Sequence, residues 1–505
     1  MARKEATIVF DKGLSQGLST YSGDMQSVNC YPVLTPGERS PAQLVSVPGG
    51  EIVSQCTPDH GTGCRGLWVA STGPASEGSI ATMYGVFGDT LFRIKQDGSF
   101  IRIGTLQSSS YLVSWSENQD QTKNQTMGFV CDGVTVYTWD LKAEDAALPS
   151  SYVEATLPYV NGSNTERAIA SYITYNSYRL ILTCSNSVQW YYSDLNSSNF
   201  DSASFESSES NPDQTIRAIS HGGNVWVFSR YSYDIFTPTW NPDDPYDVGS
   251  GASGKIGCSN GDTIATVGDF LFWMGNGETS SNSIFMATVS GGITEISDPG
   301  IKNILQKWRY QAYAKGVAFS DRGHTFYALT STLDDQTIVY DVNTKQWHIR
   351  SSSNDGRLHY WDQVATKSCY NKTWYATVDS NTICQNSYTK IEDQEGRPIT
   401  RYWQSPVYVE GGDYLKLLEI RLDVECGAYE GSDSTHSVYI QPIWDGRSLD
   451  RFIRSLGAPG DRKRQVSLCG GGAGRNLVLR IGTSSRAPVI FYSARLTIET
   501  SGRTA

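Results

Sequence analysis

Short segments in which aromatic and β-branched residues alternate with polar ones recur along the chain, and each follows directly on a small-residue turn. This period-two alternation is typical of β-strands joined in hairpins or meanders. The turns recur at intervals of 45, 44, 46, 45, 55 and 49 residues, and one four-stranded propeller blade occupies about 40–50 residues. The pattern predicts a β-propeller of about seven blades, with six possible. The turns are marked by Gly88, Gly133, Ser177, Gly223, Gly268, Gly323 and Lys372.

A large sandwich with evenly spaced hairpins is the alternative interpretation. Its strands would recur every ~8–12 residues, but a sandwich has no reason to show the longer period of about 45 residues. A propeller also suits the many Trp and Tyr residues, because their rings can pack between neighbouring blades.

The blade pattern ends near residues 395–398, and strands of a different kind follow. About 100 residues with their spacing are typical of a small β-sandwich. The predicted organisation is an N-terminal arm with a ring-closing strand (1–50), a propeller (51–398) and a C-terminal β-sandwich-like domain (399–505). Within the last part we expect strands at 414–422, 438–444, 477–481 and 489–498.

Composition supports an all-β protein. The 505 residues include 48 Gly, 29 Tyr and 13 Trp, and only 18% are charged, which excludes an all-helical protein and a disordered chain. One short amphipathic helix is predicted at 301–308, where apolar residues stand at helical spacing after Asp298-Pro299-Gly300.

The charge balance limits the partners. The chain has 41 basic and 52 acidic residues, a net charge of −11, which argues against a polybasic nucleic-acid binder or a protein that adheres to anionic membranes. The apolar run at residues 6–10 is too short for a secretory signal, and no segment approaches the ~20 apolar residues of a membrane span. We therefore expect no membrane anchor and no export.

The usual signatures of chemistry are missing from the sequence. The six histidines show no HxH or HxxxH spacing, and the ten cysteines form no CxxC pair, so we expect buried reduced thiols. We predict no catalytic residue, no metal and no cofactor.

One cluster of basic residues near the C-terminus stands out. It could contact an acidic neighbouring protein or a phosphate backbone, and a solvated loop face is the alternative. The candidate partner-contact patch consists of Arg451, Arg454, Arg462, Lys463 and Arg464.

Several motifs in a fixed order resemble the packaged-DNA stabilisation proteins, the tail-hub or head-completion proteins of short-tailed bacteriophages. The opening Val28-Asn29-Cys30-Tyr31-Pro32 is similar to that of the family, although Val33 stands where the family has an acidic residue. Further matching segments are 48–50, 87–93, 193–196, 209–213, 224–228, 256–258 and 272–275.

The resemblance implies a structural virion protein of the tail, assembled in the host cytoplasm. Copies of it, most simply six, would form a ring below the portal and its adaptor that retains the packaged DNA. The expected partners are further copies of the chain, the portal adaptor, the tail needle, a tailspike or tail fibre, and DNA that passes without sequence-specific binding. Catalysis is not required for this role.

Two other functions stay open at this stage. A glycan-binding or glycan-cleaving propeller would use the many Trp and Tyr rings to stack on sugars, and Ser320-Asp321-Arg322-Gly323-His324 loosely resembles the Asp-box turn of sialidases. A propeller that serves as a scaffold for other proteins is the third possibility. Buried aromatic residues would favour the phage protein over the glycan-acting one.

Overall fold

The structure is a computed structural model, and almost all of its regular elements are strands. It describes residues 2–16, 24–35, 41–160, 165–208, 213–239, 241–276, 281–354, 357–409, 413–429, 436–457 and 464–501.

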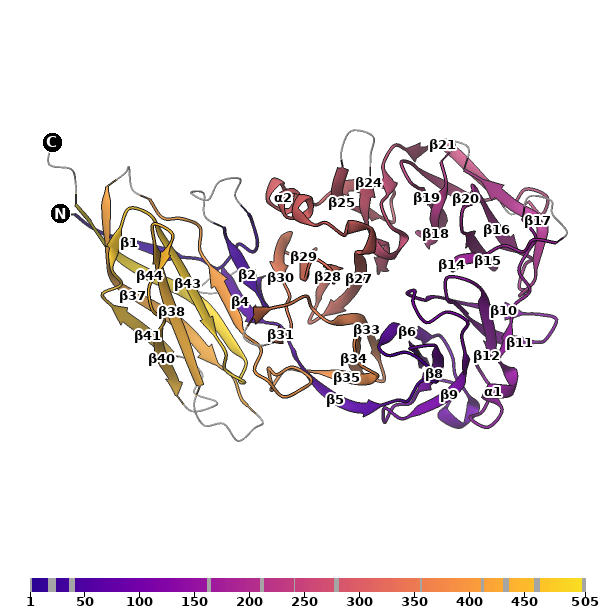
Figure 1. The fold of residues 1–505 in the computed structure, drawn as a ribbon, viewed down its shortest axis with the longest axis horizontal. Coiled ribbons are helices and arrows are strands. Elements are labelled where there is room, and N and C mark those ends of the chain that lie inside the picture. Colours follow the sequence, from indigo (N-terminus) through magenta and orange to yellow (C-terminus); the bar gives the residue numbers. More distant parts are fainter. Residues whose placement is uncertain are drawn as a thin grey trace.

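Most of the chain forms a ring of small antiparallel sheets, each made from strands that follow one another in the sequence (Figure 1). Their inner strands contact those of the next sheet around the ring. We number these sheets as blades in chain order. Blade 1 contains β6 (Cys64–Ala70), β7 (Thr82–Phe87), β8 (Thr90–Ile94) and β9 (Phe100–Thr105); blade 2, β10 (Ser114–Asp120), β11 (Gln125–Cys131), β12 (Val136–Asp140) and β13 (Val153–Glu154); blade 3, β14 (Ala170–Asn176), β15 (Arg179–Cys184), β16 (Gln189–Ser193) and β17 (Phe200–Ser207); blade 4, β18 (Thr215–His221), β19 (Asn224–Ser229), β20 (Tyr233–Pro238) and β21 (Tyr246–Gly254).

The remaining blades close the ring. Blade 5 has one split inner strand, and blade 6 opens a ten-stranded sheet that continues beyond the ring. Thus six blades are separate sheets and a seventh is continuous with the rest of the molecule. In blade 7 the outer strand, β5 (Gly49–Gln55), comes from the N-terminal side and pairs with β35. Blade 5 contains β22 (Gly257–Cys258), β23 (Ala265–Val267), β24 (Phe270–Asn276), β25 (Ser281–Thr288) and β26 (Ile293–Glu295); blade 6, β27 (Lys315–Asp321), β28 (His324–Ser331), β29 (Gln336–Asp341) and β30 (Gln346–Ile349); blade 7, β33 (Gln363–Cys369), β34 (Lys372–Thr377) and β35 (Thr382–Ser387) with β5.

The predicted β-propeller is confirmed, and its blades pack through aromatic and aliphatic side chains. Trp190 is fully buried among residues of blades 3 and 4, 5.0 Å from the ring of Phe236. Trp273 of blade 5 packs 5.0 Å from Phe228 of blade 4. The large rings thus fill the wedges between sheets, where each can bury about 150–250 Å².

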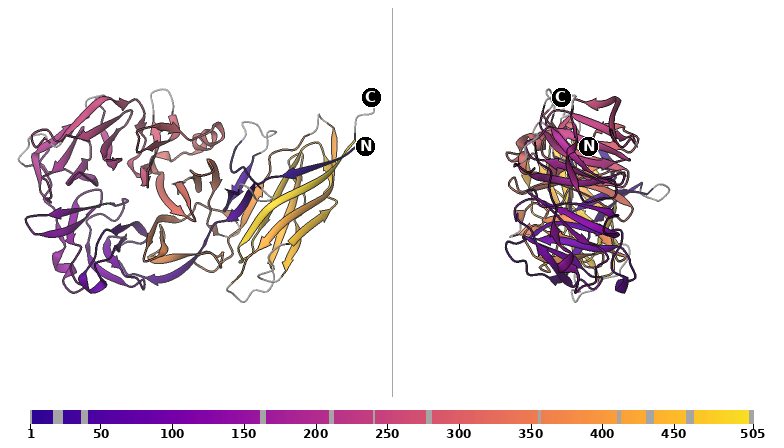
Figure 2. Two further views of the ribbon diagram at one scale, coloured as in Figure 1. Left: turned by 180° about the vertical axis from the view of Figure 1, so that it is seen from behind. Right: turned by 90° about the vertical axis from the view of Figure 1, so that its right-hand side faces the viewer.

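The rest of the chain forms two facing sheets that we call the two-sheet region. Strands from both ends of the chain meet in it: β1 (Ala2–Ile8) pairs along β44 (Val489–Ser501), at the end of the molecule away from the blades (Figures 1 and 2). One hydrophobic core lies between the two sheets and includes Phe10, Trp403 and Leu496. The other strands are β2 (Gln26–Val28), β3 (Cys30–Leu34), β4 (Ala42–Ser46), β36 (Arg401–Gln404), β37 (Tyr414–Cys426), β38 (His436–Trp444), β39 (Arg447–Ser448), β40 (Phe452–Gly457), β41 (Arg464–Cys469), β42 (Ala473–Gly474) and β43 (Leu477–Thr483).

The two-sheet region joins the propeller through β2. This strand pairs in parallel with β30 of blade 6 and antiparallel with β36. Next to it, the buried Asn29 amide donates to the carbonyls of Ser351 (2.9 Å) and Thr400 (3.0 Å). The N-terminal segment is therefore not a separate arm: most of it is built into the two sheets before β5 closes the ring.

Helices are short and lie outside the sheets. The predicted helix is present as α2 (Pro299–Lys307), and the Asp298 side chain caps it by accepting from the Ile301 N–H at 2.8 Å. The other α-helix described is α1 (Leu148–Ser151). Two strands, β31 (Ser353–Asn354) and β32 (Arg357–Leu358), form a small separate hairpin. Among the described residues, no helix has the length and apolar character needed to cross a bilayer.

Candidate functional site

The inner strands of the seven blades enclose a cavity of about 200 Å³ at the centre of the ring, which we call the central cavity. Every blade contributes at least one residue to its lining. Among these residues are Arg65 of blade 1, Arg217 of blade 4 and Lys367 of blade 7. The cavity is therefore a product of the whole ring and of no local motif.

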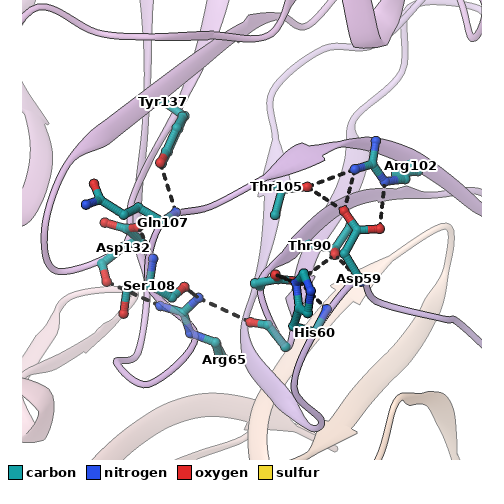
Figure 3. A network of polar contacts seen from close by, with 12 residues as sticks. Asp59, His60, Arg65, Thr90, Arg102, Thr105, Gln107, Ser108, Asp132 and Tyr137 are labelled. Carbon is teal, nitrogen blue, oxygen red and sulfur yellow. Dashed lines mark hydrogen bonds and ion pairs between the residues drawn. The ribbon is translucent and has the colours of Figure 1, made fainter.

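Arg65 joins blades 1 and 2 (Figure 3). Its guanidinium donates to the carbonyls of Gly88, Ser108, Tyr111 and Asp132, and the Asp132 carboxylate in turn accepts from the N–H of Ser108 at 2.9 Å. Burial lowers the pKa of Arg65, while the nearby Asp132 and Asp89 oppose that change. Each of its three nitrogens thus donates to a backbone carbonyl, and these bonds use four of its five N–H groups.

A second polar cluster is centred on Asp59 and lies near the contacts of Arg65 (Figure 3). The Arg102 guanidinium and the Thr105 hydroxyl both donate to the Asp59 carboxylate, and these hydrogen bonds lower its pKa. His60 lies 2.8 Å from Asp89. Each carboxylate is already paired, so the cluster is a surface network that fixes a loop.

Arg217 spans blades 4 and 5. Its Nη1 donates to the carbonyls of Gly261 (2.8 Å) and Ile264 (3.2 Å), and its guanidinium lies 4.5 Å from the centre of the Tyr172 ring. The Tyr172 hydroxyl donates to Asp262 at 2.9 Å, so the acidic group of the cavity is already hydrogen-bonded.

Two lysines add positive charge, one in the lining of the cavity and one beside it. Lys367 lies on β33, and burial alone lowers its pKa. Lys315 is on the neighbouring inner strand β27, and burial also lowers its pKa, against opposing effects of Asp262 and Asp379. In an acidic chain, the centre of the propeller is thus locally basic.

The structure separates the residues of the predicted basic patch. Arg451 lies over the Tyr439 ring at 4.6 Å, whereas exposed Arg454 donates to the Ser467 carbonyl of β41, on the other sheet. For Arg464 only the backbone position in β41 is described, paired with Val424. Arg462 and Lys463 lie outside the described residues.

Arg480 on β43, which the sequence analysis did not indicate, lies on the same outer face of the sheet as Arg451. Its guanidinium lies 4.9 Å from the Tyr402 ring and donates to Gln404 at 2.7 Å. The neighbours of Arg480 in the strand point into the core, so Arg480 is on the outer face of the sheet. We call Arg451 and Arg480, with their tyrosines, the outer arginine face. The signal in the sequence is the alternation Leu479-Arg480-Ile481.

The two parts of the molecule also differ in charge. Residues 49–398, which contain the propeller, have 23 basic and 37 acidic side chains, a net charge of −14. Residues 1–48 and 399–505 together have 18 basic and 15 acidic side chains, a net charge of +3.

The closed ring of blades, its central cavity and the attached pair of sheets define a β-propeller protein with no group of three metal-ligating side chains among the described residues. The sequence model of the phage stabilisation family, described as "Bacteriophage P22 Gp10, beta-propeller", matches residues 14–387, well over half of the chain. The chain belongs to this family, as its motifs indicated, and is a structural protein of a bacteriophage virion.

Other comparisons add no functional argument. The chain is similar to the Pan2 WD40 domain of Neurospora crassa, with 10% identity over 69% of this chain and 96% of that one and a TM-score of 0.39. The Cps50 (Swd1) β-propeller domain of Myceliophteria thermophila is 11% identical over 67% of this chain and 99% of that one, with a TM-score of 0.40. An exo-β-1,3-galactanase of Phanerochaete chrysosporium is 10% identical over 90% of this chain and 100% of that one, with a TM-score of 0.26. No curated protein sequence matches.

Proposed function

We propose that this chain is a tail-hub subunit of a short-tailed phage. Several copies, six by family resemblance, form a ring below the portal and its adaptor, retain the packaged DNA and provide attachment for the tail needle and for tailspikes or fibres. The observation that carries the proposal is the opposite net charge of the propeller and the two-sheet region.

A ring of identical subunits needs two different surfaces on each copy, because its contacts are head to tail. This chain offers such a pair: a propeller with a net charge of −14, and a two-sheet region whose outer arginine face has no carboxylate in ion-pair distance among the described residues. Opposite potentials speed association and fix orientation. Arg451 of the predicted basic patch, together with Arg480, thus becomes a proposed subunit contact.

The tryptophans support a structural role over glycan binding. A sugar site uses exposed aromatic rings beside clustered carboxylates. Of the twelve described tryptophans, ten are buried, among them Trp139, Trp190 and Trp374, and the other two, Trp68 and Trp115, stack on each other with centroids 5.8 Å apart. Their role is to pack the blades and the core of the two-sheet region.

Electron microscopy of virions and of the purified chain tests the proposal. We expect several copies coaxial with the portal. A position off the tail axis, or a purified chain that degrades polysaccharide, would overturn it.

Charge reversal tests the proposed contact itself. The double variant Arg451→Glu/Arg480→Glu should lose ring assembly in mass photometry while its circular dichroism stays unchanged. Lys416→Glu is the matched control, because Lys416 is an exposed residue on β37 of the opposite sheet. Equal assembly by all three proteins would place the subunit contact elsewhere.

A further inference from the structure

Lys367 is a cation at the centre of the ring, and none of the described acidic residues pairs with it. It lies on the inner strand of blade 7 and lines the central cavity. Within the described part of the chain, no carboxylate lies within ion-pair distance of its ammonium group, and no hydrogen bond from that group is present. Burial alone lowers its pKa.

Two neutral hydrogen-bonding groups of the lining also have no partner in the part of the chain that the structure describes. The Thr366 hydroxyl and the Trp115 indole N–H are both buried and make no hydrogen bond to the described residues. Thr366 is only 5% exposed. Leaving a buried polar group without a partner is destabilising, and most such groups in proteins are hydrogen-bonded to the chain or to an ordered water molecule.

The other charges of the cavity are also mainly positive. Arg217 uses Nη1 for two backbone carbonyls, and no hydrogen bond from its other two nitrogens to the described residues is present. Arg65 and Lys315 add charge close by. Asp262 is the acidic residue of the lining, and the Tyr172 hydroxyl already donates to it.

We propose that the central cavity binds a small oxyanion, of the chemical class of inorganic phosphate, between Lys367 and Arg217. The anion compensates the unpaired ammonium group of the half-buried Lys367 and accepts from donors that the described residues leave unused. A volume of about 200 Å³ exceeds that of the ~150 Å³ cavity known to accept a benzene-sized ligand. It is far too narrow for a duplex, so the occupant is a free anion rather than packaged DNA.

Inorganic phosphate is the probe. At constant ionic strength, phosphate in place of chloride should raise the melting temperature of the purified chain, and calorimetry should give one site per chain. Lys367→Gln should weaken phosphate binding at least tenfold. Because Lys367 has no counter-charge among the described residues, this variant should be no less stable than the natural chain in phosphate-free buffer. Those two results together distinguish loss of a ligand from loss of the fold.

Lys142→Gln is the matched control, since Lys142 is an exposed residue on the outside of blade 2 and the substitution removes the same charge. It should bind phosphate as the natural chain does. Equal phosphate stabilisation of Lys367→Gln would overturn the proposal. So would competition by a short single-stranded oligonucleotide at equal phosphate concentration, which would assign the site to a nucleic-acid backbone.

Discussion

The propeller and the two-sheet region are both antiparallel β-structures, but they are assembled in different ways. Each separate blade except the last is built from strands adjacent in sequence, so most of its pairings are local. In the two-sheet region β1 pairs with β44, and Ala2 lies opposite Thr500. Local pairings form with little loss of chain entropy, whereas pairings across the whole chain form late. The propeller is modular, and the two-sheet region depends on both ends of the chain.

The two regions should differ most in how far unfolding spreads when a buried tryptophan is removed from each. Trp403 packs edge-to-face on Phe10 at 5.0 Å, and its indole N–H donates to the Lys12 carbonyl at 3.1 Å. Trp403→Ala should cost about 3–5 kcal/mol and should expose amides at both ends of the chain, in β1, β36 and β44. Hydrogen exchange measures this effect by element.

Trp190→Ala is the matched variant in the propeller. Trp190 is equally buried, but its neighbours belong to blades 3 and 4. We expect a similar loss of stability and faster exchange confined to those two blades, because a repeat contacts only its neighbours. Exchange that spreads around the whole ring would show that the propeller is not modular.

If Trp403→Ala fails to fold, Trp403→Phe replaces it in this comparison, because phenylalanine keeps most of the contact with the Phe10 ring.

The next largest loss of stability is expected when a hydrogen-bonding side chain is removed from the junction between the two regions. Asn29 is buried, donates to carbonyls on both sides of the junction and accepts from the Ser351 N–H at 2.8 Å. Its φ of 53° is a left-handed conformation that asparagine tolerates better than alanine. Asn29→Ala should cost about 1–3 kcal/mol for the groups left unsatisfied, measured by urea unfolding.

Asn343→Ala is the control for the junction. Asn343 makes comparable side-chain hydrogen bonds to Thr325 and Gly323, but it lies exposed in a turn of blade 6. We expect a clearly smaller loss there, because water replaces the missing partner. Equal losses at the two sites would mean that the Asn29 contacts do not couple the regions.

Acid should weaken the junction more than the distant blades. Burial, together with the nearby Arg350 and His324, lowers the pKa of His348 well below its usual value. The unfolded chain therefore binds a proton that the folded chain does not, and stability falls as pH drops below about 6.5, by at most about 1.4 kcal/mol per pH unit. His348→Gln should flatten the pH dependence of urea unfolding between pH 5 and 7. If the stability of His348→Gln changes with pH as steeply as that of the natural chain, His348 does not cause the pH dependence.

The sequence predicted the number of blades better than it predicted their boundaries. The marker turns are not equivalent: Gly88 and Gly133 lie between the second and third strands of their blades, whereas Ser177, Gly223 and Gly268 lie between the first and second. Both kinds of turn join strongly apolar strands, so the pattern alone could not distinguish them. The period near 45 residues persisted because one marker fell in each blade.

The central cavity could not be predicted in the same way. Arg65, Arg217 and Lys367 stand in three different blades, 152 and 150 residues apart, and only ring closure brings them together. Their local signal is a charged residue in the first strand of a repeat, as in Cys64-Arg65-Gly66. The basic cluster at 451–464 is contiguous and therefore visible in the sequence, yet pleating directs Arg451 and Arg454 to different surfaces.

The smallest effect on stability is expected for the cysteines. The number of thiols that react in the native chain tests burial in both regions at once. Nine of the ten cysteines are buried and Cys469, at the end of β41, is exposed. Burial raises the pKa of Cys30 in the two-sheet region and of Cys64 in the propeller to about 12, so neither thiol ionises near neutral pH. An aromatic disulfide reagent should therefore modify one thiol in the native chain and ten after denaturation. Cys469→Ser should abolish the native reaction without changing the melting temperature. A second thiol that reacts quickly in the native chain would reveal local opening, and its place in the sequence would show which of the two regions opens first.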